Sequence, residues 1–162
     1  MTTVNAATVG IVLRRASRDD VARIATLIML GSPQPQLTRE EIAVEAAHPS
    51  YLDAFLAIDA STHSALFVAE EEGAVIGTIQ VTLIPGLIAR GRMRAKFESV
   101  HVAPERRGQG IGALMVAHAL TFARENGAGI AELTSNKARG DAHRFYVRLG
   151  FEQSHEGFKM VL

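Results

Sequence analysis

The stretch from Val100 to Ala113 limits the fold more than any other part of the chain, because it joins an apolar strand to a helix through a loop rich in glycine and arginine. Three glycines alternate along it: Gly108, Gly110 and Gly112. Glycine lets a ligand approach the backbone, and the first N–H groups of the following helix have no partner within that helix. The helix dipole favours an anion there, and Arg106 and Arg107 add positive charge. The segment therefore predicts a loop that binds a phosphate or pyrophosphate.

The glycines alone leave the nucleotide open. Gly108-x-Gly110-x-x-Ala113 also matches the dinucleotide-binding fingerprint, with Glu132 near the expected ribose position. Against that alternative, five residues separate the strand from Gly108. The chain after the loop is also too short for a full doubly wound sheet. The Gly-Lys-Ser/Thr sequence of ATP-binding P-loops is absent.

The pattern Arg107-x-x-Gly110-x-Gly112 resembles the pyrophosphate loop of the GNAT superfamily of acyl-CoA-dependent N-acetyltransferases, which reads Arg/Gln-x-x-Gly-x-Gly/Ala. A second segment, Ala142-His143-Arg144-Phe145-Tyr146-x-x-Leu149-Gly150-Phe151, is similar to the last helix of that family and the strand entry after it. Its apolar residues fall at helical spacing, and the glycine stands where a helix would end. The resemblance runs from about residue 66 to residue 162. Within the family, the C-terminal half is similar to aminoalkylphosphonate acetyltransferases.

This resemblance implies an α/β (α+β) fold: a mixed, mostly antiparallel sheet of six to seven strands, flanked by helices and splayed between the fourth and fifth strands. Periodicity and turn residues place strands at residues 9–13, 66–70, 75–84, 96–102, 130–134, 151–153 and 158–162. Capping boxes at Ser17 and Thr38 open the first two of five expected helices, which end near residues 31, 48, 58, 126 and 149. Length and hydrophobic content predict one domain over residues 9–162, after a loose tail over residues 1–8.

Composition narrows the function. Seventeen basic residues balance seventeen acidic ones, so a basic surface for nucleic acid is not expected. No run of about eighteen apolar residues and no secretory signal pattern occur, so we expect a cytoplasmic protein without a membrane partner. The chain has no cysteine, which excludes disulfides, a cysteine acyl-enzyme and thiolate metal ligands. No metal is expected.

Acetyl transfer from a thioester to an amine needs a deprotonated amine, a donor to the oxyanion and a proton for the leaving thiolate. The resemblance implies Glu98 as general base through a water. The alternative is a carboxylate that only binds the substrate ammonium or pairs with Arg92 or Arg94. It implies Tyr146 as the acid, since a phenol with a pKa of about 10 suits that task; the alternative is a core aromatic residue. His101 and His143 are interpreted as structural rather than as proton carriers.

Acetyl-CoA is the implied co-substrate. The resemblance places its pantetheine arm and thioester oxygen along Val100, His101 and Val102. It places the pyrophosphate on the loop formed by Arg107, Gly108, Gln109, Gly110, Ile111, Gly112 and Ala113. A family asparagine seven residues before the tyrosine is not matched, because that position holds Arg139. Counting from the preceding strand gives Asn136 instead, which we take as the cofactor contact.

The acceptor is less constrained. Arg90, Arg92, Arg94 and Lys96 alternate, so in an extended chain they share a face that could hold an anionic group of the acceptor, or simply be solvated. We expect acetyl transfer to the primary amine of a small molecule in a ternary complex, with a monomer and a homodimer both open. The alternatives are acetylation of a protein N-terminus or lysine, and a non-catalytic sensor of acyl-CoA.

Overall fold

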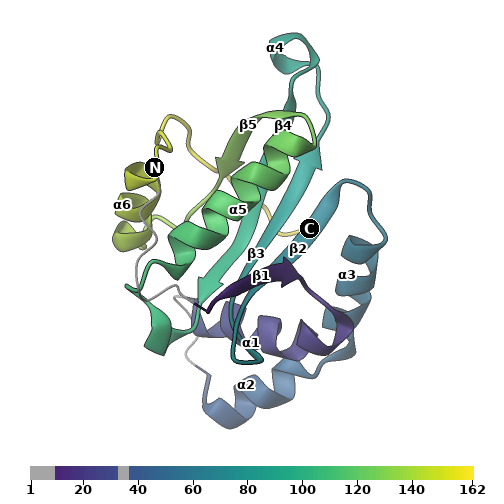
Figure 1. The fold of residues 1–162 in the computed structure, drawn as a ribbon, viewed down its shortest axis with the longest axis vertical. Coiled ribbons are helices and arrows are strands. Elements are labelled where there is room, and N and C mark those ends of the chain that lie inside the picture. Colours follow the sequence, from purple (N-terminus) through teal and green to yellow (C-terminus); the bar gives the residue numbers. More distant parts are fainter. Residues whose placement is uncertain (1–9, 33–36) are drawn as a thin grey trace.

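The computed structural model describes residues 10–32 and 37–162, and the predicted tail over residues 1–8 lies outside them. The described part of the chain forms one five-stranded sheet in which the strand order follows the chain (Figure 1). The strands are β1 (Val12–Arg15), β2 (Ser64–Glu71), β3 (Ala74–Ile84), β4 (Met93–Val102) and β5 (Ala128–Leu133). All neighbours are antiparallel except β4 and β5, which are parallel. The mixed α/β architecture expected from the sequence is confirmed.

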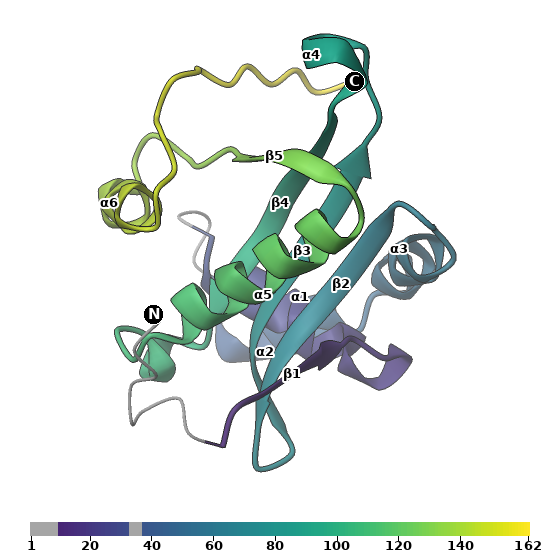
Figure 2. The same cartoon turned by 45° about the horizontal axis from the view of Figure 1, so that its top comes forward.

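Helices cover both faces of this sheet. Figure 2 shows α5 on one face and the helices α1 and α3 on the other. The helices are α1 (Val21–Leu30), α2 (Arg39–Ala46), α3 (Pro49–Asp59), α4 (Ile88–Gly91), α5 (Ile111–Glu125) and α6 (Gly140–Arg148). Two short 3-10 turns, η2 (Arg18–Asp20) and η3 (Pro104–Arg106), precede α1 and the glycine loop.

Each face of the sheet has its own apolar core. On the α5 face, Phe97 and Ile79 are almost fully buried beside Met115. On the opposite face, Leu27 of α1 packs in a cluster with Phe55 of α3. Because side chains alternate along a strand, burial of Phe97 against α5 turns Glu98 toward the side of α1 and α3.

Local hydrogen bonds explain where the first helices begin. Both predicted capping boxes form, and at the second Thr38 Oγ1 accepts from the Glu41 amide at 3.2 Å. Arg14 donates to Asp20 Oδ2 at 2.7 Å and to Glu70 Oε2 at 2.7 Å. β1 occupies residues 12–15, so it extends beyond the end of the strand that we predicted at residues 9–13. Gly10 and Ile11 are not in the strand, and residue 9 lies outside the described residues.

Two other predictions need correction. The expected strands at residues 151–153 and 158–162 do not form, so the sheet formed by the described residues has five strands rather than six or seven. The polar residues 152–157 offer no apolar face, and Phe158, Met160 and Leu162 stay exposed. A strand with neither a partner nor a buried face is not stable. The central strand is also longer than predicted, because β4 begins at Met93 directly after the irregular turn α4.

Candidate active site

β4 has a bulge where it pairs with β3, and in the same region it separates from β5. Thr78 pairs with His101 and Gln80 with Glu98, so two residues of β4 lie opposite one residue of β3. Ser99, in this bulge, has a φ of 51°. On its other side, β4 pairs with β5 only as far as Phe97 and Leu133.

Beyond that pair, β5 leaves β4 and the chain runs to α6 (Figure 2). The predicted splay between the fourth and fifth strands is therefore present. Val100, His101 and Val102 lie along the part of β4 that has no β5 partner. An unpaired strand edge offers main-chain N–H and C=O groups to an extended ligand.

The glycine loop follows the end of β4. Gly110 is the N-cap of α5 with a φ of 86°, a conformation that glycine adopts at little cost. The amide of Leu114 donates to its carbonyl at 3.0 Å, so the N–H groups of Ile111, Gly112 and Ala113 precede the ladder of helix hydrogen bonds. A Cβ at Gly112 would lie 3.2 Å from Phe145 Cζ. That glycine therefore allows α6 to pack closely against the start of α5.

The two arginines of the loop differ. Arg106 is bonded to Glu71, with one of its contacts at 2.8 Å, and to Gln109 Oε1 at 3.0 Å. Its charge is thus compensated within the protein, so Arg106 adds less positive charge beside the loop than we expected. Arg107 donates to the carbonyls of Val102 at 3.2 Å and Leu30 at 3.4 Å, and it pairs with no carboxylate among the described residues. Arg107 is the cation that remains for a phosphate.

The positive charge of Arg139 affects the pKa values of both His101 and Tyr146. Burial, with the positive charges of Arg139 and Arg107, lowers the pKa of His101 to about 4. Burial raises the pKa of Tyr146 above its usual value, and the charge of Arg139 opposes this. Near neutral pH, His101 is therefore neutral and Tyr146 carries its proton. The Tyr146 hydroxyl has no hydrogen bond with the described residues, so it is available to a ligand.

The half-buried imidazole of His101 predicts a pH dependence of stability. The unfolded chain binds a proton at His101 below a pH of about 6.5, whereas the folded chain binds it only near pH 4. Stability should therefore decrease as pH falls through this window, by at most about 3 kcal/mol from this group. Urea unfolding of the wild type and of His101→Gln at several pH values measures the difference. Parallel stability curves for the two proteins would contradict the assignment of His101 as a half-buried neutral group.

The loop before α6 places the two candidates for the family asparagine differently. Asn136 Oδ1 accepts from the amide of Ala138 at 2.9 Å, which closes a local turn. His143 Nε2 lies 2.9 Å from the carbonyl oxygen of Asn136, so this imidazole holds the same turn, as its structural interpretation implies. Arg139 is half-buried, and its positive charge lowers the pKa values of His101 and Tyr146. The cofactor role of Asn136 stays a prediction. Of the two residues, Arg139 is the one whose charge affects the pKa values of His101 and Tyr146.

Of the four alternating basic residues, the two that lie in β4, Arg94 and Lys96, form ion pairs. Lys96 Nζ lies 2.9 Å from Glu98 Oε1, so the partner of Glu98 is neither of the two arginines that we considered. Arg94 donates to both oxygens of Glu132, at 2.9 and 3.1 Å. Glu132 thus has an ion-pair partner of its own and is not free for a ribose. The side chain of Arg92 lies against Gly129.

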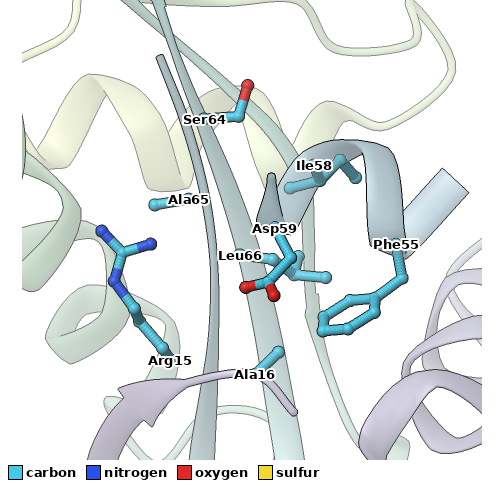
Figure 3. Close-up of a pocket in the computed structure, with 8 residues that line it drawn as sticks. All are labelled: Arg15, Ala16, Phe55, Ile58, Asp59, Ser64, Ala65 and Leu66. Atoms are coloured by element: carbon cyan, nitrogen blue, oxygen red, sulfur yellow. The ribbon is translucent and has the colours of Figure 1, made fainter. Parts of the chain in front are cut away.

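A pocket opens beside Glu98 on the face of α1 and α3. Its volume is about 140 Å³, and its lining residues are Val21, Ile24, Ala25, Ile28, Tyr51, Ala54, Phe55, Ile58, Leu66, Gln80 and Ser99. A second hollow at the end of α3 shares Phe55, Ile58 and Leu66, which Figure 3 shows gathered between α3 and β2. Its volume of about 10 Å³ is no more than one water requires.

Sequence reasoning did not identify this pocket, because its lining consists of apolar residues whose spacing only indicates helices that face a core. The role of Ser99 could not be predicted either, since a serine does not indicate a β-bulge. A signal was available only in Gln80, a polar residue that alternates with buried apolar neighbours in β3.

Other kinds of site are not found in the described part of the chain. No group of three or more His, Cys, Asp or Glu side chains there is arranged to hold a metal ion. Among the described residues, no helix is both long enough and apolar enough to cross a bilayer.

Comparison with known proteins agrees with this geometry. The model of the acetyltransferase (GNAT) family matches residues 33–151. Aminoalkylphosphonate N-acetyltransferase of Salmonella typhimurium is 34% identical over 152 residues, which cover 93% of this chain and 90% of that protein. A crystal structure of a transcriptional regulator from Bacillus halodurans is 34% identical with a TM-score of 0.85, covering 94% and 99% of the two chains. A putative acetyltransferase from Agrobacterium tumefaciens is 28% identical with a TM-score of 0.74, covering 93% and 99%.

Proposed function

The chain belongs to the GNAT family of acetyltransferases, and from that premise we propose that it transfers the acetyl group of acetyl-CoA directly to the primary amine of a small molecule. Both substrates bind at once in this proposal. The observation that carries it is the unpaired edge of β4 over residues 98–102, with the glycine loop at one end and Glu98 at the other. The expectations of a cytoplasmic location and of a monomer or homodimer remain predictions.

Acetyl-CoA fits the residues present. Arg107 and the amides of Gly110 to Ala113 would hold the pyrophosphate, because Gly110, the N-cap of α5, has no side chain that would cover the first turn of the helix. Val100 to Val102 would pair with the pantetheine amides. The buried Ser135 Oγ has no partner within the described residues and is a further polar group beside β5. The thioester supplies an activated acyl group.

The chain's own residues would manage two protons. Glu98, through a water, accepts a proton from the ammonium so that the nitrogen lone pair can attack the thioester carbon. The C–N bond forms, and a backbone N–H of Val100 to Val102 stabilises the oxyanion. When the C–S bond breaks, the Tyr146 hydroxyl donates its proton to the thiolate, and the amine nitrogen releases its second proton, which restores the phenol through water. Burial supports this role, because it keeps Tyr146 protonated near neutral pH.

Replacement of Glu98 distinguishes its two candidate roles. If Glu98 is the general base, the rate should rise with pH through a group that is absent in Glu98→Gln, and maximal rate should fall. If it only binds the ammonium, the variant should mainly raise the apparent KM at a similar maximal rate. Glu132→Gln, at a carboxylate paired with Arg94, is the control. An unchanged maximal rate and an unchanged acidic limb in Glu98→Gln would exclude the general-base role.

Two alternatives remain specific enough to test. The similar protein from Bacillus halodurans is called a transcriptional regulator, and this name favours a non-catalytic sensor of acyl-CoA. Acetylation of a protein N-terminus or lysine is the other. The name of the Salmonella relative favours a small amine that bears a phosphonate. A panel of aminoalkylphosphonates, simple amines, amino sugars and short peptides, assayed by release of the CoA thiol, separates them. Binding of acetyl-CoA without turnover on any amine would favour the sensor.

A further inference from the structure

We infer that the pocket beside Glu98 binds the substituent of the acceptor, and that this substituent is an uncharged apolar group of the size of a branched alkyl chain or a phenyl ring. The inference rests on the proposed function, because it names the class of amine that the same site would acetylate.

Register places the pocket next to the reacting centre. Gln80, which lines the pocket, pairs directly with Glu98 across β3 and β4. Residues directly opposite each other in an antiparallel pair project from the same face. Ser99, the next residue along β4, also lines the pocket, because the bulge changes the direction of the chain there. An amine held at Glu98 would therefore place its substituent in this pocket.

The lining favours an apolar occupant. Eight of the eleven lining residues are apolar, and the remaining three, Tyr51, Gln80 and Ser99, are uncharged. The Tyr51 hydroxyl is directed to Glu45 Oε1, at 3.4 Å. A phosphonate or carboxylate placed here would lose its hydration without gaining a cation, whereas an alkyl or aryl group gains from burial.

Two of the four alternating cations that could have served an anionic acceptor form ion pairs with carboxylates. Lys96 lies 2.9 Å from Glu98, and Arg94 lies 2.9 Å from Glu132. No lysine, arginine or histidine lines the pocket. The ligand that fits this pocket therefore differs from the aminoalkylphosphonate in the name of the Salmonella relative.

Volume sets the size of the substituent. A dry apolar cavity of about 150 Å³ is sufficient for benzene. The pocket's volume of about 140 Å³ thus accommodates a phenyl ring or a branched chain of four or five carbons.

Filling the pocket from its rim tests the inference. Ala54 on α3 lines the pocket and is exposed, so Ala54→Leu should reduce the pocket volume without disturbing the fold. Ala57→Leu is the matched control, since Ala57 is also exposed on α3 but does not line the pocket. The assays measure kcat/KM with acetyl-CoA for 2-phenylethylamine, isopentylamine, methylamine and 2-aminoethylphosphonate.

We expect the wild type to prefer the phenyl and isopentyl amines over 2-aminoethylphosphonate. Ala54→Leu should lower kcat/KM for the two apolar amines by a factor of about ten or more and leave methylamine within about twofold. Ala57→Leu should match the wild type. Preference for 2-aminoethylphosphonate, or equal effects of the two leucine variants, would overturn the inference while leaving the proposed function intact.

A binding measurement tests the pocket assignment independently of acetyl transfer. With CoA bound, titration of 2-phenylethylamine should show binding to the wild type and to Ala57→Leu, and at least tenfold weaker binding to Ala54→Leu. If no amine is acetylated although 2-phenylethylamine binds in this pattern, the proposed function fails and the pocket assignment stands. If 2-phenylethylamine does not bind to the wild type, the pocket assignment fails.

Discussion

Gly110→Val is expected to lower the affinity for acetyl-CoA by at least about a hundredfold. Gly110 begins α5 with a φ of 86°, and the amides of the next three residues would hold the pyrophosphate. A valine there places a branched side chain beside those amides and moves the loop out of the left-handed conformation. Hydrogen bonds to a charged group contribute about 1.5–3 kcal/mol each, so the loss of two accounts for a change of this size.

The chain supplies a control for backbone strain. Gly127, just beyond the other end of α5, has a φ of 82° and open space where a Cβ would lie. Gly127→Val should therefore cost similar stability and leave the affinity for acetyl-CoA unchanged. Calorimetric titration and thermal unfolding of both variants measure the two effects. Equal affinities in Gly110→Val and the wild type would mean that the glycine loop does not bind the cofactor.

Tyr146→Phe is expected to lower turnover by a factor of about one hundred while cofactor affinity changes little. The variant keeps the aromatic ring, whose centroid lies 5.1 Å from that of Phe145 and 5.8 Å from that of Phe151, so packing is preserved. It removes only the hydroxyl that would protonate the thiolate. Because burial raises the pKa of Tyr146, the wild-type rate should also show no alkaline decline from this group below a pH of about 10.

Steady-state kinetics and cofactor titration on the same preparations test this prediction. A second substrate makes the test specific: an acetyl thioester of a more acidic thiol needs less assistance from an acid, so the variant should lose less activity with it than with acetyl-CoA. A variant with normal turnover would leave Tyr146 as a packing residue. Equal losses on both thioesters would argue that the hydroxyl has a structural role.

The elements that the sequence predicts well are those with strong local signals. The capping box at Thr38 and Glu41 forms as expected, and α5 begins at Ile111, directly after the glycine loop. The helix from Gly140 to Arg148 matches its apolar spacing and ends just before Gly150. In these segments, hydrogen bonds and periodicity within a few residues are enough to determine the structure.

The errors have non-local causes. β1 extends past its predicted end, in a segment where Arg14 pairs with Asp20 and with Glu70, which lies far along the chain. The apolar alternation at the C-terminus predicted a strand, but Phe158 and Met160 find no surface to cover them. Arg106 was expected to add positive charge beside the glycine loop, but it forms an ion pair with Glu71, at the hairpin of β2 and β3. A pairing between distant residues leaves no trace in the local pattern of either residue.

The proposed function depends on direct transfer between two bound substrates, and one measurement tests this most directly. Initial rates should be recorded over a matrix of acetyl-CoA concentrations and concentrations of the best amine in the panel. Direct transfer predicts rates that depend on both substrates and reciprocal plots whose lines intersect. Parallel lines would indicate an acetyl-enzyme intermediate, and thiol release that does not depend on the amine would indicate hydrolysis; either result would contradict acetyl transfer in a ternary complex.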